Sequence, residues 1–361
     1  MSRIALLAPT FSGFSGIDRV VENQARQLVA RGDTVDIFTF EADMEPPPGA
    51  NLHIIGMPKS LFWQRIYRLL LPLDYFKNSR IAIQLRNFDI VYSHQYPMNW
   101  LAFQAKKRFN VKYIYYDYGI TPPKAFSTFA ERVYMMIFNS LSILTAAKAD
   151  AAISISHYLH NELKKDTGLI SEVVYPRIDT GRFRPGIDSS AIRQKYGITS
   201  EPLVLYVGRI SPHKGIHLLI QAFLEVQRQI PGIKLLMAGK HTFTDYSRRL
   251  TSMSNSSIIF AGYVPDEDIP SYYAACSVYA TATLWEGFNL PLAEAQACGK
   301  PVVAFNLGPH LEVVLEGKTG YLSPPGDVHA MATAIHSLVT TDTAREKMGK
   351  DAAEFVKEKF G

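Results

Sequence analysis

The sequence has few of the features that mark disulfide-rich, membrane-spanning or nucleic-acid-binding proteins. Its only cysteines, Cys276 and Cys298, indicate buried free thiols rather than a disulfide framework or a metal site. It has no run of about 18 apolar residues and nothing like a signal peptide near its start, so we predict a cytoplasmic protein without a spanning helix. The net charge of +5 suits small anionic ligands or an anionic membrane surface, and no nucleic acid is expected as a partner.

The chain instead alternates short apolar strands with amphipathic helices along its whole length. A strand at 4–8 leads through a Ser/Gly-rich loop into a helix at about 17–31 and a strand at 34–40. The same order starts again with a strand at 203–207 and a helix at 216–229. This alternation predicts an α/β protein with doubly wound parallel sheets.

A proline-bearing segment without periodicity, residues 173–185, separates the two halves. The 361 residues are too many for one ordinary core but sufficient for two. We therefore predict an N-terminal domain over residues 1–180 and a C-terminal domain over residues 181–361.

Two carboxylates stand eight positions apart in the second half. Glu286 lies in a predicted loop, and Glu294 lies in the first turn of a predicted helix that Pro291 opens. Gly299 marks the end of that helix, and a buried strand follows at 301–305. One carboxylate beside loop amides and another on the adjoining helix indicate a ligand site rather than a packing interface.

A short basic loop, GRISPHKG, follows the strand at 203–207. Arg209 and Lys214 lie between Gly208 and Gly215, beyond the carboxyl end of the strand and just before a helix. Two cations in this position favour a phosphate-binding loop over a solvated surface loop. Glu294 could accept hydrogen bonds from the hydroxyls of a ribose, so the second half would bind a nucleoside diphosphate that carries a sugar.

The first half carries weaker signals. Gly13 and Gly16 lie in the loop before the first helix, where backbone amides could bind an anion or the glycines could simply form a tight turn. His94 and Asp117 each follow a predicted strand. Ligands bind beyond such strand ends, but a lone histidine is often a core residue, so both interpretations stay open.

A basic and aromatic segment, residues 59–78, is typical of an amphipathic helix that lies on an anionic membrane surface. The apolar segment at 133–147 could join it there. The alternative, that both are helices covering the core of the first domain, is favoured because most amphipathic helices in α/β proteins are structural.

Taken together and in order, these motifs resemble those of glycosyltransferase family 4, which has the GT-B fold. The matching segments are the Ser/Gly-rich loop, DIVYS with His94, YPRIDTGRFRP, VGRISPHKG, and the block from EGFNLPLAEAQACGKPVVA to GKTGYL. The resemblance implies two Rossmann-like domains that face each other across a cleft. It also implies a retaining hexosyltransferase that uses a nucleotide-sugar and needs no obligatory metal or other cofactor.

The resemblance further implies a role for each matching residue. Arg209 and Lys214 would neutralise the departing diphosphate, Glu294 would hold the ribose, and Glu286 would contact the donor sugar. His94 would lie near the donor sugar, and Gly16 would direct its amide to the phosphate. Further donor contacts would come from Gly208, Val264, Gly287, Phe288, Asn289 and Leu290, with Asp117 on the acceptor side.

The sequence departs from the family pattern at several places. Ser15 stands between the glycines of the first loop, Pro176–Arg177 replaces an Asn–Gly pair, and Gly308–Pro309 replaces a glycine pair. The family pattern usually continues beyond a segment like the one ending at Gly361, with a last helix that returns to the N-terminal domain.

The acceptor implied by the resemblance is a glycan or a lipid-linked sugar, in the synthesis of a cell-surface polysaccharide or glycolipid. Two alternatives remain: a nucleotide-sugar-binding protein without transfer activity, and a glucan synthase-like enzyme. A dinucleotide oxidoreductase is disfavoured, because neither half has the three-glycine fingerprint.

Overall fold

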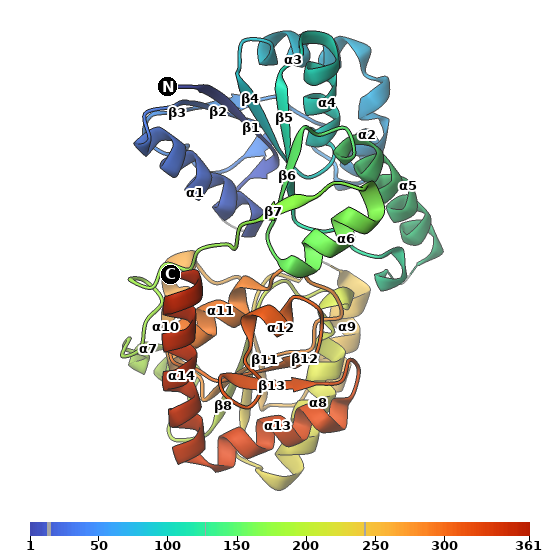
Figure 1. The fold of residues 1–361 in the computed structure, drawn as a ribbon. Coiled ribbons are helices and arrows are strands. Elements are labelled where there is room, and N and C mark those ends of the chain that lie inside the picture. Colours follow the sequence, from blue (N-terminus) through green and yellow to red (C-terminus); the bar gives the residue numbers. More distant parts are fainter. Residues whose placement is uncertain (13–15, 127, 242) are drawn as a thin grey trace. The chain divides into compact units, whose positions relative to one another are not determined.

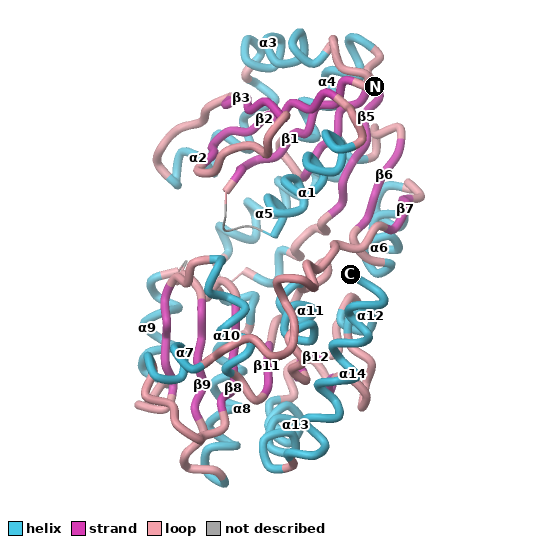
Figure 2. Tube along the Cα trace, turned by 90° about the vertical axis from the view of Figure 1, so that its left-hand side faces the viewer, coloured by secondary structure: helices cyan, strands magenta, loops and turns pink. Residues whose placement is uncertain are grey.

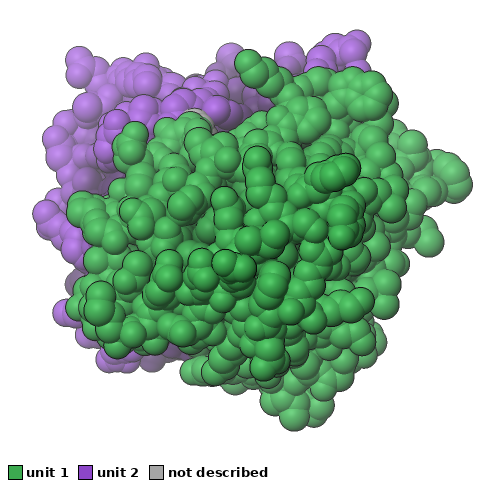
Figure 3. Space-filling view, turned by 90° about the horizontal axis from the view of Figure 1, so that it is seen from above, with its two compact units in different colours: residues 1–123, 128–175 green, residues 124–127, 176–361 purple. Residues whose placement is uncertain are grey.

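The computed structural model describes residues 1–12, 16–126, 128–241 and 243–361 (Figure 1). The chain forms two compact units, coloured separately in Figure 3. Residues 1–123 and 128–175 make up the first, and residues 124–127 and 176–361 make up the second. Apart from the short segment 124–127, the chain therefore passes from the first unit to the second within the proline-bearing segment.

The first unit is built on a seven-stranded parallel sheet in the order β3-β2-β1-β4-β5-β6-β7. Its strands are β1 (Arg3–Phe11), β2 (Thr34–Ala42), β3 (Ala50–Ile54), β4 (Ile90–His94), β5 (Lys112–Asp117), β6 (Ala151–Ser154) and β7 (Ser171–Val173). Its helices are α1 (Gly16–Ala30), α2 (Leu61–Leu70), η1 (Leu71–Leu73), α3 (Tyr75–Leu85), α4 (Met98–Phe109), α5 (Phe129–Ala146) and α6 (His157–Thr167), and η2 (Pro123–Ala125) spans its boundary.

The second unit holds six parallel strands in the order β10-β9-β8-β11-β12-β13, of which β9, β8, β11 and β12 are labelled in Figure 2. They are β8 (Leu203–Val207), β9 (Lys234–Ala238), β10 (Ile258–Gly262), β11 (Val278–Thr281), β12 (Val302–Phe305) and β13 (Gly320–Ser323). The helices are α7 (Ser190–Lys195), η3 (Pro212–Lys214), α8 (Ile216–Gln229), α9 (Thr244–Met253), η4 (Asp266–Asp268), α10 (Ile269–Ala275), α11 (Leu290–Ala297), α12 (His310–Val313), α13 (Val328–Thr340) and α14 (Asp342–Phe360).

The winding of each sheet reverses between two neighbouring strands. These are β1 and β4 in the first unit and β8 and β11 in the second. Loops that leave the carboxyl ends of such a pair diverge and leave room for a ligand. Both sheets are therefore of the doubly wound type predicted from the sequence.

Apolar periodicity explains how the second sheet is covered. Helix α8 buries Ile216, Leu219, Ile220 and Phe223 on one side, the spacing of an amphipathic helix. These side chains share one core cluster with residues of α9 and α13. Strand β8 is buried over most of its length, as expected for a parallel strand covered on both faces.

The predicted elements agree closely with the observed ones in the second unit, where β8 and α8 have the predicted bounds and β12 begins one residue later than predicted. Residues 59–78 differ, because they do not form one helix. Pro72 lies in η1, which follows α2, and Asp74 then caps α3 by accepting a hydrogen bond from the Lys77 amide at 3.1 Å. None of the helices among the described residues combines the length and apolarity needed to cross a bilayer.

Candidate active site

The loops after β8 and β11 meet at the reversal point of the second sheet. The His213 carbonyl accepts hydrogen bonds from the Leu284 amide at 2.9 Å and the Thr283 hydroxyl at 3.3 Å. Gly215 adopts a φ of +62°, and a Cβ there would lie 1.9 Å from the Ala282 carbonyl oxygen. The loops can approach this closely only because residue 215 is glycine.

A second glycine pair joins the β8 loop to the β9 loop. The Gly208 amide donates to the Ala238 carbonyl at 2.9 Å. A Cβ on Gly239 would lie 1.8 Å from the Gly208 carbonyl oxygen, and both glycines have a φ near +150°. The predicted donor-binding residue Gly208 thus sets the course of the basic loop.

Lys214 and Glu286, predicted to contact different parts of a ligand, form an ion pair between the two loops. Both side chains are largely buried. Burial alone would raise the pKa of Glu286, but the charge and hydrogen bond of Lys214 outweigh it and lower the pKa. Glu286 is therefore ionised at neutral pH, and its charge is compensated by Lys214.

Arg209 lies exposed at the start of the same loop. Within the part of the chain that the structure describes, its guanidinium forms no ion pair or hydrogen bond, while its carbonyl accepts from the Tyr206 hydroxyl at 3.0 Å. Burial, helped by the neighbouring cations, lowers the pKa of His213 to about 4, so this histidine adds no charge at neutral pH. The loop therefore presents one uncompensated cation.

Glu294 lies in α11 and is 5% exposed. Its carboxylate accepts a hydrogen bond of 2.8 Å from the Tyr273 hydroxyl, which comes from α10 and is fully buried. Burial first, and then the nearby Glu294 carboxylate, raise the pKa of Tyr273 well above its usual value. The tyrosine therefore stays protonated and acts as a donor that orients Glu294.

Asn289 connects this site to the end of β12. It has a left-handed φ of +78° at the start of α11, and its side-chain amide donates to His310 Nε2 at 2.9 Å. His310 Nδ1 donates to the Phe305 carbonyl at 2.7 Å, so the ring is neutral with its proton on Nδ1. Burial lowers the pKa of His310, which agrees with that assignment.

The remaining predicted donor contacts lie around this centre. Phe288 is 2% exposed and meets Phe360 of α14 edge-on with ring centroids 5.2 Å apart, so its side chain packs in the core. Gly287 is buried in the loop, Leu290 begins α11, and Val264 is 7% exposed after β10.

His94 lies at the end of β4 but is completely buried. Its ring stacks on Tyr116 with centroids 5.0 Å apart, and Nδ1 lies 2.8 Å from the Tyr118 hydroxyl. Burial lowers the pKa of His94 to about 3, so the ring is neutral at physiological pH. The structure places this histidine in an aromatic cluster, and its predicted contact with a donor sugar stays a prediction.

Asp117 ends β5 and is 3% exposed. It accepts hydrogen bonds from the Gly119 amide at 2.9 Å and the Ser154 hydroxyl at 3.2 Å, and burial raises its pKa to about 7. Gly16 is the first residue of α1, whereas Gly13 and Ser15 lie outside the described residues.

Sequence reasoning did not single out three residues that contact or adjoin predicted site residues: Tyr273 and His310 in the second unit, and Asp18 in the first. Asp18, in the first turn of α1, accepts from the Ser12 amide at 2.9 Å, and burial raises its pKa to about 6. His310 follows the end of β12, the positional signal that had identified His94, but a tyrosine within a helix carries no such signal.

Among the described residues, no group of three or more His, Cys, Asp or Glu side chains is arranged to hold a metal ion. The groups present at the site are fixed charges, backbone amides and hydrogen-bonding carboxylates.

Two family profiles match the chain almost from end to end. The profile "Glycosyltransferase Family 4" matches residues 14–182, and "Glycosyl transferases group 1" matches residues 188–355. The second match contains the whole site built from the loops after β8 and β11.

Similar sequences carry related names. The chain is 31% identical over 213 residues to a GDP-mannose-dependent alpha-(1-6)-phosphatidylinositol monomannoside mannosyltransferase of Mycolicibacterium smegmatis. The matched region covers 56% of this chain and 56% of the relative. It is 27% identical over 371 residues to a D-inositol 3-phosphate glycosyltransferase of Kribbella flavida, covering 94% of this chain and 86% of the relative.

Solved structures share the fold at lower identity. HepE of Anabaena, in complex with UDP and glucose, gives a TM-score of 0.83 at 20% identity and covers 100% of this chain and 96% of that one. A sucrose-phosphate synthase of Thermosynechococcus elongatus gives 0.84 at 23% identity, with 100% and 95% coverage. The fold is therefore GT-B, as the sequence predicted.

Proposed function

The chain belongs to the glycosyltransferases of group 1 and family 4, and from this premise we propose that it transfers a hexose, such as mannose or glucose, from a nucleoside-diphosphate sugar to a glycan or lipid-linked acceptor. The observation that carries the proposal is the cluster at the reversal point of the second sheet. It combines an uncompensated Arg209, the Lys214–Glu286 pair and the Tyr273-oriented Glu294. The name of the mannosyltransferase relative supports mannose as a first candidate sugar.

In the proposed complex, the diphosphate lies against the basic loop. Arg209 binds it with parallel N–H donors, and Lys214 turns from Glu286 to the phosphate. Glu286 then becomes available to the hydroxyls of the donor sugar, while Glu294 holds the ribose.

We propose retention of the anomeric configuration without an obligatory metal. The bond from the anomeric carbon to the phosphate oxygen breaks as the bond to the acceptor oxygen forms on the same face. The acceptor proton passes to the departing phosphate oxygen. Cations already in place stabilise the growing charge on that oxygen more strongly in the transition state than in the ground state, which is the condition for catalysis.

Substitution of the basic loop tests the proposal. We expect Arg209→Ala to lower turnover by about tenfold or more, equivalent to about 1.4 kcal/mol. Arg228→Ala is the matched control, because Arg228 is an exposed arginine in the last turn of α8. Equal turnover of the two variants would contradict the assignment of the diphosphate to this loop.

The donor is best identified by a thermal-shift screen over nucleoside diphosphates and their sugars. A ligand at 100 times its dissociation constant stabilises the native protein by about 2.7 kcal/mol, enough to rank the bases. Binding of a donor without release of nucleoside diphosphate in the presence of any acceptor would favour a binding protein that lacks transfer activity.

We further propose that the first unit contacts an anionic membrane surface, where a lipid-linked acceptor would lie. Large apolar side chains are exposed on α2 and on α5: Phe62, Trp63, Leu70, Phe129, Met136, Ile137 and Leu144. The two helices are neighbours, since Arg65 of α2 lies 4.0 Å from Glu131 of α5. Exposed apolar surface on this scale, with cations such as Arg65 beside it, supports membrane contact over simple core covering.

A flotation assay with vesicles containing anionic phospholipid tests this part. Phe62→Ser combined with Trp63→Ser should lower the membrane partition coefficient about a hundredfold or more, because each buried side chain contributes about 1.5–3 kcal/mol on transfer from water. Ile170→Ser is the control, since Ile170 is an apolar residue exposed elsewhere on the first unit. If the unmodified protein does not bind the vesicles, the proposal is wrong and α2 and α5 serve only to cover the core of the first unit.

A further inference from the structure

A pocket in the second unit lies at the amino ends of the strands of its sheet, whereas the basic loop follows a carboxyl end. Ser277 comes directly before β11 and Pro301 directly before β12, so the pocket opens at the amino ends of these strands. The loops that carry Arg209 and Glu286 follow the carboxyl ends of β8 and β11. Because all the strands are parallel, the two sites lie at opposite ends of the sheet.

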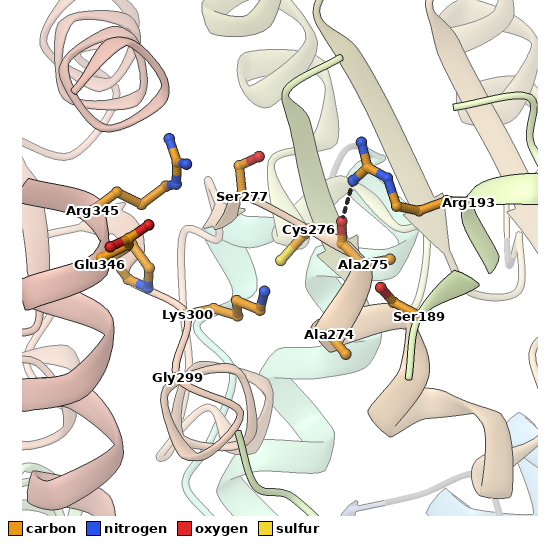
Figure 4. Close-up of a pocket in the computed structure, with 11 residues that line it drawn as sticks. Ser189, Arg193, Ala274, Ala275, Cys276, Ser277, Gly299, Lys300, Arg345 and Glu346 are labelled. Carbon is orange, nitrogen blue, oxygen red and sulfur yellow. Dashed lines mark hydrogen bonds between the residues drawn. The ribbon is translucent and has the colours of Figure 1, made fainter. Parts of the chain in front are cut away.

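The pocket has a volume of about 310 Å³, at the lower limit of the range for small-molecule sites. Its charged lining consists of three cations and one carboxylate: Arg193, Lys300, Arg345 and Glu346. Figure 4 shows Arg345 and Glu346 on one side of the pocket and Arg193 on the other, with Lys300 between them. The balance of charge therefore favours an anion.

The three cations differ in how they are held. Arg193 donates to the Ala275 carbonyl at 2.7 Å (Figure 4). It also donates to the carbonyls of Thr199 and Glu201, and these bonds fix its position without cancelling its charge. Arg345 pairs at 2.6 Å with Asp342, whose own side chain is 76% exposed. An ion pair so open to water is strongly screened, which leaves Arg345 able to bind another anion.

Lys300 is the central group of the pocket. Its ammonium has no hydrogen bond or ion pair with any residue that the structure describes, although its backbone amide is fixed to the Ala295 carbonyl at 3.0 Å. The nearby thiol of Cys276 does not compete for the role of reactive group, because burial raises its pKa to about 11. The pocket therefore offers charge and hydrogen-bond donors rather than a nucleophile.

We propose that this pocket binds the phosphate group of a small phosphorylated molecule. A phosphate dianion would receive hydrogen bonds from the Lys300 ammonium and the Arg345 guanidinium, and it would balance the positive charge that Glu346 and the exposed Asp342 leave uncompensated. The volume accommodates the phosphate together with a few additional carbon and oxygen atoms. The site is independent of the proposed donor site, since no residue is common to both.

Calorimetric titration of the full chain at constant ionic strength tests the proposal, with inorganic phosphate in one arm and glycerol phosphate in the other. We expect saturable binding in at least one arm, and tighter binding of glycerol phosphate would identify an organic phosphate as the better ligand. Lys300→Ala should weaken binding by about tenfold, the contribution of one charge-assisted hydrogen bond. Glu346→Gln should strengthen it, because it removes the opposing charge.

Two controls separate this site from the basic loop. Lys350→Ala removes an exposed lysine from the same helix as Arg345, outside the pocket, and should leave binding unchanged. Arg209→Ala should also leave phosphate binding at this pocket intact. Any one of three results would overturn the proposal. The first is loss of all phosphate binding in Arg209→Ala, and the second is equal affinity of Lys300→Ala and the unmodified protein. The third is the absence of saturable binding in both arms of the titration.

Discussion

The hydrogen bond from Tyr273 to Glu294 gives the sharpest test of how the second unit holds its central carboxylate. Tyr273→Phe removes only the hydroxyl, which donates to the carboxylate at 2.8 Å from a fully buried position. A hydrogen bond to a charged group contributes about 1.5–3 kcal/mol, so we expect the free energy of unfolding to fall by that amount.

A neighbouring tyrosine supplies a control for the loss of the hydroxyl itself. The Tyr279 hydroxyl is also buried, but it donates to the neutral Val207 carbonyl at 3.3 Å. Tyr279→Phe should therefore cost about 0.5–1.5 kcal/mol. The difference between the two variants isolates the contribution of the charge on Glu294.

A double-mutant cycle with Tyr273→Phe and Glu294→Gln makes the prediction quantitative. Urea unfolding of each variant is monitored by circular dichroism, and the dependence of the unfolding free energy on urea concentration must be the same for all variants. The cycle should then give a coupling energy of about 1 kcal/mol or more. Independent effects of the two substitutions, with a coupling below about 0.3 kcal/mol, would refute the orienting role of Tyr273. Tyr273→Phe should also weaken nucleoside diphosphate binding, whereas Tyr279→Phe should not.

Three further predictions concern the backbone and the buried ionisable groups. Gly215→Ala should cost about 3 kcal/mol in denaturant unfolding, because its Cβ would clash with the Ala282 carbonyl, whereas Gly317→Ala, with a similar φ and open space, should cost about 1–2 kcal/mol. Burial lowers the pKa of His94 to about 3, so the contribution of the neutral ring to the free energy of unfolding is complete above pH 6.5. That contribution should be lost at about 1.4 kcal/mol per pH unit as pH falls toward 3. A His94→Gln variant without a flatter pH profile would contradict this. Burial raises the pKa of Asp117 to about 7, so its contribution to the free energy of unfolding is complete below pH 3.8 and is lost as pH rises to 7. The stability of Asp117→Asn relative to the unmodified chain should therefore increase between pH 3.8 and 7. A stability difference that stays constant over this interval would contradict the prediction.

Much of the second unit follows from local patterns. The apolar spacing of α8 and the short buried strands around it are visible in the sequence, and α8 and β8 appear with the predicted bounds. The break in residues 59–78 was also encoded locally: Pro72 lies within η1, and Asp74 caps the next helix. It was missed because the amphipathic pattern continues through the break.

The contacts of the site were harder to predict, because they depend on residues far apart in the chain. Lys214 and Glu286 are 72 positions apart, and they meet because β8 and β11 are neighbours in the sheet. Tyr273 reaches Glu294 from a different helix, and no local pattern specifies that approach. Sequence reasoning could identify the charged residues but not their partners.

The Lys214–Glu286 pair changes what binding of a diphosphate would require at this site. Buried charges are costly unless they are paired, and these two already compensate each other. Under the proposed function, a diphosphate would take Lys214 from Glu286, and Glu286 would then need new donors. Sugar hydroxyls are suitable donors, so a nucleoside diphosphate without its sugar would leave this carboxylate less well satisfied. Comparing the two ligands on Glu286→Gln therefore distinguishes the role of Glu286: the variant should reduce the advantage of the sugar-bearing donor more than it reduces binding of the free diphosphate.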